Sequence, residues 1–161
     1  MTFRNQLKLI SRKIRLAGKL LNFDTVQTIF QFSDSRCCGQ NAQFQSAKEV
    51  EAFIKDKHRH GAMIILTGDL NVQDGYEKSR AVRYFKGQSQ SAPNPPYVLE
   101  DTFRTANGEH VDGTTFEHAG KIDYIFARKG TRVESSVIDR KNYGPASDHW
   151  PINAVIKVQG F

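Results

Sequence analysis

Apolar positions recur at two different spacings along the chain, and the change of spacing separates the predicted helices from the predicted strands. Between Ala42 and His58, apolar residues return every three or four positions, which predicts a helix. Ala62–Leu66 is a continuous apolar run close to glycines on both sides, which is typical of a strand buried on both faces. Further runs rich in β-branched and aromatic residues are expected to be strands: Thr28–Phe32, Ile122–Ala127, Arg132–Ile138 and Ile152–Val158.

The order of these elements predicts the fold class. A second helix is expected at Tyr76–Phe85, and the prolines of Gln88–Pro96 indicate a loop. Strand, helix, strand and helix are thus followed by several strands, which favours an α/β or α+β domain with layered sheets. The 161 residues leave room for one domain or a large fraction of one.

The first part of the chain, Met1–Phe23, combines apolar residues at a roughly helical spacing with six cationic side chains and no acidic one. Three interpretations stay open. The segment is a basic amphipathic helix for a membrane surface or a partner, an organellar transit peptide, or simply an exposed helix or a segment that does not belong to the fold. Charges interrupt every apolar stretch, so a secretory signal is excluded.

The basic residues are unevenly distributed along the chain, and this distribution changes the interpretation of the net charge. The sequence holds 23 Lys and Arg against 17 Asp and Glu, a formal charge of +6. Because Met1–Phe23 contains six of the basic residues and no acid, the remainder is neutral, so nucleic acid is an open partner class that the body charge does not indicate. No run of about 18 apolar residues occurs, so no transmembrane segment is expected. The adjacent Cys37 and Cys38 form no disulfide framework, which favours a reduced, cytoplasmic setting.

A polar segment, Thr67–Asn71, directly follows the apolar run that ends at Leu66. Asp69 and Asn71 are two residues apart, so in extended backbone both side chains would lie on one side of the strand. A carboxylate next to an amide suits the orientation of water beside a phosphate, and because Gly, Asp and Asn favour turns, a plain turn is the alternative. A calcium-binding loop is excluded, since the sixth and twelfth positions counted from Asp69 are Asp74 and Arg80 instead of Gly and Glu.

Two further places carry candidate chemistry. Asp148 and His149 immediately precede the last predicted strand and offer a hard oxygen ligand beside a titratable imidazole. Asp123 stands among large apolar residues, where an unpaired carboxylate is costly and an imidazole N–H is a natural partner. The alternatives are a polar loop with an incidental histidine, and an Asp123 side chain on the solvent face of its strand.

Together these segments resemble the endonuclease/exonuclease/phosphatase superfamily of metal-dependent phosphoesterases. The resemblance is carried by TGDLN at 67–71, TF at 102–103, GTTF at 113–116, KIDYIF at 121–126 and SDHWP at 147–151, with the helix QSAKEVEAFI at 45–54. It implies an α/β (α+β) fold similar to DNase I, namely a partial two-sheet β-sandwich flanked by helices. It also implies a phosphodiester or phosphomonoester substrate.

The resemblance further implies a role for each matching residue. Asp69 would orient or deprotonate the attacking water, and Asn71 would hold the nucleophile and the phosphate. His149 would act at the scissile phosphate, oriented by Asp123. Asp148, together with Asp69, would bind Mg²⁺ or Mn²⁺ and so place positive charge around the phosphate oxygens.

The resemblance covers residues 41–161 as the C-terminal half of such a domain, whereas residues 1–40 form a basic N-terminal segment that does not match. Members usually run to about 250 residues in one domain, and their N-terminal half supplies an Asn and the main metal-binding Glu, neither of which has a match here. Phe32 stands where the family usually carries a histidine. We therefore expect a truncated or frame-disrupted member, with the missing strands encoded upstream of Met1. The alternative function is a catalytically dead remnant or a binding module.

An incomplete sandwich has an energetic consequence. Leaving about 500 Å² of apolar strand surface in water would forfeit on the order of 10 kcal/mol, which is comparable to the stability of a whole domain. We therefore expect self-association or a complementing chain. The class of phosphate ester is not specified by these motifs.

Overall fold

The computed structural model describes residues 7–16, 19–28, 39–58, 63–74, 79–89, 97–141 and 147–157. These ranges contain strands and helices in a mixed order. Along the chain they are β1 (Leu7–Leu16), β2 (Lys19–Thr28), α1 (Gly39–His58), β3 (Met63–Asp69), α2 (Arg80–Phe85), β4 (Leu99–Asp101), α3 (Thr102–Asn107), β5 (Asp123–Arg128), β6 (Arg132–Ile138) and β7 (Ile152–Lys157).

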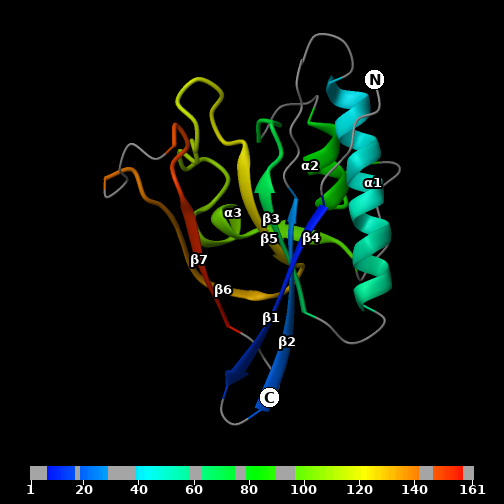
Figure 1. Ribbon diagram of the computed structural model, residues 1–161. Coiled ribbons are helices and arrows are strands. Elements are labelled where there is room, and N and C mark those ends of the chain that lie inside the picture. The colour runs from blue at the N-terminus through cyan, green and yellow to red at the C-terminus, as the bar shows by residue number, and fades with distance from the viewer. Residues whose placement is uncertain are drawn as a thin grey trace.

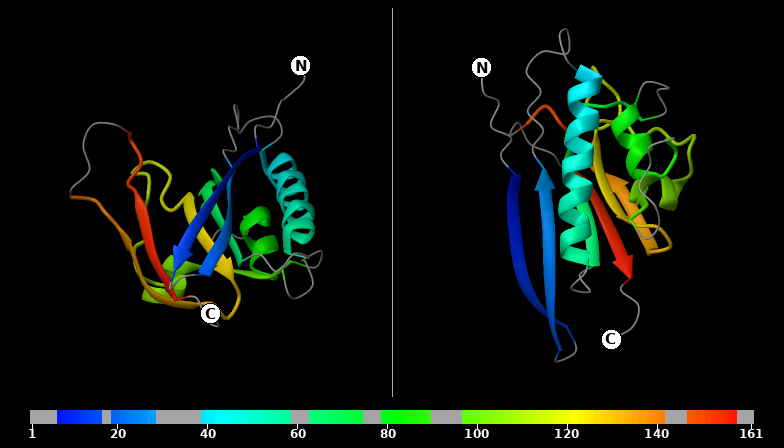
Figure 2. Two further views of the ribbon diagram at one scale, coloured as in Figure 1. Left: turned by 60° about the horizontal axis from the view of Figure 1, so that its bottom comes forward. Right: turned by 90° about the vertical axis from the view of Figure 1, so that its right-hand side faces the viewer.

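The strands form two sheets (Figure 1). The larger sheet has the order β1-β2-β3-β5-β4, in which β2 and β3 are parallel and the other neighbours are antiparallel. β6 and β7 form a separate antiparallel sheet. The larger sheet lies between α1 and α2 on one side and the β6–β7 sheet on the other, as the left view of Figure 2 also shows. This arrangement confirms the predicted mixed α/β class with two sheets and flanking helices.

The main hydrophobic core lies between α1, α2 and one face of the larger sheet. The residues that α1 buries there are Phe44, Ala47, Val50 and Ile54. β3 contributes alternate residues, and its Leu66 pairs with Phe126 of β5. Met63 and Ile65 on the other face of β3 are only half-buried, so the expectation of burial on both faces is wrong. The physical reason is that the two helices cover one face, whereas the opposite face meets the smaller β6–β7 sheet.

The N-terminal part of the described chain is a β-hairpin, so the helix expected within Met1–Phe23 is wrong. β1 and β2 pair antiparallel, with Ile14 opposite Leu21, and β2 then pairs in parallel with β3. The spacing also fits a strand, because Ile10, Ile14 and Leu16 are separated by even numbers of positions. Backbone pairing with β3 then favours the strand over the helix. The boundary expected at residue 40 stays a prediction.

Most later elements agree with the pattern. β5, β6 and β7 lie within one residue of the predicted strands at each end, and α1 begins at Gly39, three residues before its predicted start. Of the predicted strand Thr28–Phe32, only Thr28 is described, as the last residue of β2. Residues 29–38, 75–78 and 90–96, which include parts of a predicted strand, helix and loop, lie outside the described residues. Within the described part of the chain, no helix is long and apolar enough to cross a membrane.

Two short elements, β4 and α3, have no counterpart in the sequence pattern. β4 pairs with β5 through only three residues, and Asp101 ends it. The carboxylate of Asp101 accepts a hydrogen bond from the N–H of Phe103 at 3.0 Å and so caps the start of α3. This cap joins the edge of the larger sheet to the helix that packs on β6.

Candidate active site

Two carboxylates lie side by side on one face of the larger sheet. Asp69 is the last residue of β3 and Asp123 the first of β5, and the antiparallel register pairs them directly. Because Leu66 and Phe126 face the helices, the two carboxylates lie on the face toward the β6–β7 sheet. Like charges directly opposite each other destabilise a sheet, so stability does not explain this pair.

The chain turns sharply after Asp69. The N–H of Asn71 donates to Asp69 Oδ1 at 2.7 Å, and its side-chain amide donates to Oδ2 at 3.1 Å. Asn71 has a φ of 50°, in the left-handed region that asparagine tolerates better than most residues. Gln43 of α1 donates to the Asn71 carbonyl at 3.1 Å. Both interpretations of this segment therefore apply, since the turn itself holds the carboxylate beside the amide.

His149 joins the two carboxylates from a distant part of the chain. Its Nδ1 lies 2.9 Å from Asp123 Oδ2, which is the contact predicted from the sequence. The ring of Phe116 stacks on the imidazole, with ring centres 4.8 Å apart and planes at 18°. The neighbouring backbone is paired too, because the N–H of Trp150 donates to the Thr115 carbonyl at 2.8 Å. The imidazole is thus held at Nδ1 by Asp123 and on one face by Phe116, which leaves Nε2 as its other ring nitrogen.

The carboxylates perturb one another and the imidazole. Burial raises the pKa of Asp69, hydrogen bonds from Asn71 lower it, and the charge of Asp123 raises it, so that it lies above its usual value. Burial alone would lower the pKa of His149, but the hydrogen bond to Asp123 and the charge of that residue raise it. The charges of Asp69 and Asp148 act in the same direction, and the pKa of the imidazole is raised overall.

Asp148 stands at the exposed rim of this group. Its side chain is 78% exposed, and its Oδ1 lies 3.9 Å from Nε2 of His149. The residues whose potential ligand atoms all lie within 4.8 Å of one another are Asp69, Asp123 and His149. The structure therefore brings Asp69, Asp123 and His149 together with Asn71. Asp148 lies next to this group, at its exposed rim.

The donor set fits a hard divalent cation through its carboxylates better than through its imidazole. Mg²⁺ and Mn²⁺ favour oxygen ligands, and each oxygen of Asp69 keeps a lone pair besides its hydrogen bond from Asn71. Asp69, Asp123 and Asp148 surround one imidazole, and a cation would offset this excess of negative charge. Because Nδ1 of His149 is already bonded to Asp123, these two fit a hydrogen-bonded pair better than two metal ligands.

Two residues of the GTTF segment support the site, although the sequence alone assigns them no role. Thr115 is fully buried, and its Oγ1 accepts hydrogen bonds from the N–H groups of Ile122 and Asp123 at 3.1 Å each. Phe116 supports the ring of His149. Their presence in a motif of the resemblance is the signal that could have found them, whereas nothing in the sequence pointed to Gln43.

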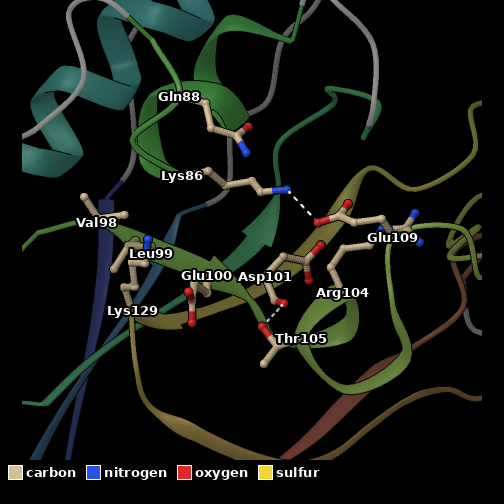
Figure 3. A pocket seen from close by; sticks show the side chains of 10 residues that line it. All are labelled: Lys86, Gln88, Val98, Leu99, Glu100, Asp101, Arg104, Thr105, Glu109 and Lys129. Atoms are coloured by element: carbon tan, nitrogen blue, oxygen red, sulfur yellow. Dashed lines mark hydrogen bonds and ion pairs between the residues drawn. The ribbon is translucent and has the colours of Figure 1, made fainter.

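A hollow of about 220 Å³ lies at the edge of the larger sheet, among the end of α2, β4 and α3 (Figure 3). Lys86 and Glu109 approach each other there, at 3.4 Å between Nζ and Oε1. The full lining is Lys86, Gln88, Val98, Leu99, Glu100, Asp101, Arg104, Thr105, Glu109 and Lys129. Asp69, Asp123 and His149 are not among these residues, so this hollow is separate from the candidate site.

The fold is shared with several solved structures. The catalytic domain of Xenopus laevis APE2 superposes with a TM-score of 0.68 at 17% identity, over 92% of this chain and 54% of that one. A mannosyl-6-phosphatase of Bacteroides thetaiotaomicron gives a TM-score of 0.63 at 21% identity, over 86% and 52%. An endonuclease/exonuclease/phosphatase protein from Bacteroides vulgatus gives 0.61 at 26% identity, over 89% and 51%.

These similarities show that the chain has the fold of the endonuclease/exonuclease/phosphatase superfamily, which confirms the predicted resemblance. The chain spans about half the length of the solved structures just named. No protein-family model matches the sequence, and no curated protein matches it.

Proposed function

We propose that this chain acts as a metal-dependent phosphoesterase, which hydrolyses a phosphodiester or a phosphomonoester with an activated water. The observation that carries the proposal is the convergence of Asp69, Asn71, Asp123 and His149 where β3 ends and β5 begins. The shared fold supports it, since the solved structures with this fold include a mannosyl-6-phosphatase and an AP endonuclease from Archaeoglobus fulgidus. A phosphate ester is therefore the proposed substrate class.

Asp69 and Asn71 serve the attacking water. The Asp69 carboxylate orients the water and accepts its proton, a task that suits a carboxylate whose pKa lies above its usual value. Asn71 is held against Asp69 Oδ2 at 3.1 Å, so its amide is fixed where it contacts the nucleophile or a phosphate oxygen. The turn thus sets both groups in place before the substrate binds.

His149 and Asp123 serve the phosphate. When the Asp123 carboxylate accepts a hydrogen bond from Nδ1–H, the tautomer and the plane of the imidazole are fixed and Nε2 points away from Asp123. A protonated His149 then donates from Nε2 to a phosphate oxygen and stabilises the charge that develops there.

Asp69 and Asp148 are the residues that would hold Mg²⁺ or Mn²⁺. When bound, the cation supplies positive charge to the phosphate oxygens. The exposed position of Asp148 suits a ligand at the rim, because Mg²⁺ usually keeps several waters and needs only one or two carboxylates.

The test uses the purified chain with bis(p-nitrophenyl) phosphate and p-nitrophenyl phosphate, in Mg²⁺, in Mn²⁺ and in EDTA. We expect turnover with either metal and none in EDTA. Asp69→Asn and His149→Ala should each lower kcat by about 100-fold or more. Glu134→Gln, which removes an exposed carboxylate of β6, is the matched control and should leave turnover unchanged.

The outcome also separates the enzyme from its alternative. Absent turnover, or turnover that is indifferent to both substitutions, would favour a catalytically dead remnant or a binding module. If such a module binds nucleic acid through its cations, binding should weaken steeply as salt is raised.

We also propose that the chain self-associates or binds a complementing chain. Val137 of β6 and Val155 of β7 are 55% and 53% exposed, and a two-stranded sheet is marginally stable on its own. Sedimentation of the purified chain should therefore show association, and a monodisperse monomer would contradict it.

A further inference from the structure

A buried ion pair lies directly behind the candidate site. Lys121 and Asp101 are 2% and 1% exposed, and Nζ lies 2.8 Å from Asp101 Oδ2. Asp101 comes from the end of β4 (Figure 3), and its other carboxylate oxygen caps α3 by accepting from the N–H of Phe103. Lys121 precedes β5 by two residues. The pair therefore joins the edge strand and α3 to the start of the strand that carries Asp123.

The ammonium group of Lys121 reaches the backbone of the site. Its Nζ donates to the main-chain carbonyl of Asp123 at 3.1 Å. It also lies 3.5 Å from the centre of the Tyr124 ring, so the charge is surrounded by an anion, a carbonyl and an aromatic face. The carboxylate that bonds to His149 thus belongs to a residue whose own carbonyl is held by a buried cation.

Stability alone is a weak explanation for such a pair. Two charges lose their hydration on burial, and replacement of a buried ion pair by well-packed uncharged residues is often neutral or stabilising. The Lys121 side chain is closely packed where it passes Gly113, because a Cβ added at Gly113 would lie only 2.8 Å from its Cδ.

We propose that the Lys121–Asp101 pair positions Asp123, and through it His149, and that this positioning is its main contribution. Lys121 is a positioning residue in this inference, because it acts through Asp123. The activity part of the inference rests on the proposed function, whereas the geometric part does not.

The experiment compares the full chain with Lys121→Met, Asp101→Asn and the double variant. Asparagine keeps an oxygen that caps α3, and methionine keeps the length of the stem. Lys121→Met alone leaves an unpaired buried carboxylate and should melt well below the wild type. The double variant should recover most of the lost melting temperature, because no unpaired charge then remains.

The deciding readout is the downfield proton resonance of His149 Nδ1–H, observed by NMR in protein labelled with ¹⁵N-histidine and assigned with His149→Gln. The wild type should show it, since Nδ1 lies 2.9 Å from Asp123 Oδ2 and a proton on Nδ1 is hydrogen-bonded to that carboxylate. The double variant should lose it or exchange it at least about tenfold faster, and kcat should fall about tenfold or more with little change in KM. Lys121→Arg keeps the charge. This variant should therefore retain part of the His149 resonance and part of the wild-type kcat.

Retention of the wild-type resonance in a folded double variant would overturn the inference. If the double variant does not fold, Asp101→Asn alone decides the same question, and an unchanged exchange rate there would overturn it. Glu51→Gln is the matched control: Glu51 pairs with Lys55 at 2.5 Å and with Tyr84 on the helical side of the sheet. It should lower the melting temperature and leave the His149 resonance unchanged. A wild type without turnover refutes the proposed function, yet the resonance still tests the positioning.

Discussion

Replacement of Thr115 by valine removes one hydroxyl from the interior and leaves two backbone amides without their acceptor. The side chain is 0% exposed, and its Oγ1 accepts from the N–H groups of Ile122 and Asp123 at 3.1 Å each. Valine has nearly the same shape, so the substitution tests the hydrogen bonds and not the packing volume. The amides belong to the start of β5, directly beside the candidate site.

The magnitude follows from the number of amides that lose their partner. Each buried amide left unsatisfied costs about 1–3 kcal/mol. Because local relaxation recovers part of this, we expect Thr115→Val to lower the free energy of unfolding by about 2–4 kcal/mol. With roughly 2–4 °C per kcal/mol for a chain of this size, the melting temperature should fall by about 5–15 °C.

A second buried threonine provides the matched control. Thr102 is also 0% exposed, but within the described part of the chain its Oγ1 pairs with the Ser136 hydroxyl, at 3.4 Å. Ser136 also bonds to the Asn153 carbonyl at 3.2 Å, so Thr102→Val strands no buried amide and should cost about 1 kcal/mol or less. Thr115→Ser keeps the hydroxyl and should retain most of the stability.

The assay is guanidinium-induced unfolding followed by far-UV circular dichroism, together with amide hydrogen exchange of Ile122 and Asp123. These two amides should exchange faster in Thr115→Val and remain protected in Thr102→Val. Equal losses of stability in the two valine variants would refute the reasoning, because the number of stranded amides would then not determine the cost.

Two further predictions concern individual carboxylates. Asp69→Asn, which abolishes the proposed activity, should raise the free energy of unfolding in EDTA by roughly 0.5–1 kcal/mol, because it removes the repulsion with Asp123 opposite; lower stability in thermal melts would contradict this. For Asp112, hydrogen bonds from Thr114 and the pairing with Arg140 lower its pKa to about 2. A carboxyl whose folded pKa is depressed contributes stability above its usual pKa and loses it as the pH falls through the folded value. Asp112→Asn should therefore reduce the loss of stability between about pH 4 and 2. The reduction should be less than about 1 kcal/mol, because the side chain is largely exposed. If urea titrations show the same loss of stability over this pH range in the variant and the wild type, the prediction is wrong.

The sequence predicts the long and strongly periodic elements because their own residues determine them. The apolar stripe of α1 and the β-rich runs at β6 and β7 carry enough pattern to be placed within a few residues. Met1–Phe23 fails because its apolar spacing fits both a helix and a strand, and the choice is made by pairing of β2 with β3, which lies far along the chain. β4 and α3 are too short for a period, and their position depends on the cap at Asp101.

The candidate site, too, contains residues that the sequence predicts and residues that it does not. Asp69, Asp123 and His149 could be predicted because each carries chemistry at a strand end, where side chains of neighbouring strands meet. Thr115 and Lys121 also stand in motifs of the resemblance, GTTF and KIDYIF, but their roles could not be predicted from their spacing, because they act on backbone groups. Thr115 accepts from amides seven and eight residues away, and Lys121 donates to a carbonyl two residues away. Neither spacing forms a pattern that a sequence shows.

The direct pairing of Asp69 with Asp123 is the strongest physical argument that the end of β3 and the start of β5 have a function. A sheet gains nothing from two acids in register, and almost any polar or β-branched residue would be more favourable at either position. The surroundings nevertheless hold both carboxylates in place, one through Asn71 and the other through His149. Hydrogen bonds that fix an unfavourable pair of charges, and leave an imidazole nitrogen beside them, are typical of a site that binds a cation or a proton. A functional role for these residues would explain both the unfavourable carboxylate pair and the hydrogen bonds that hold it in place. A purely structural role explains neither.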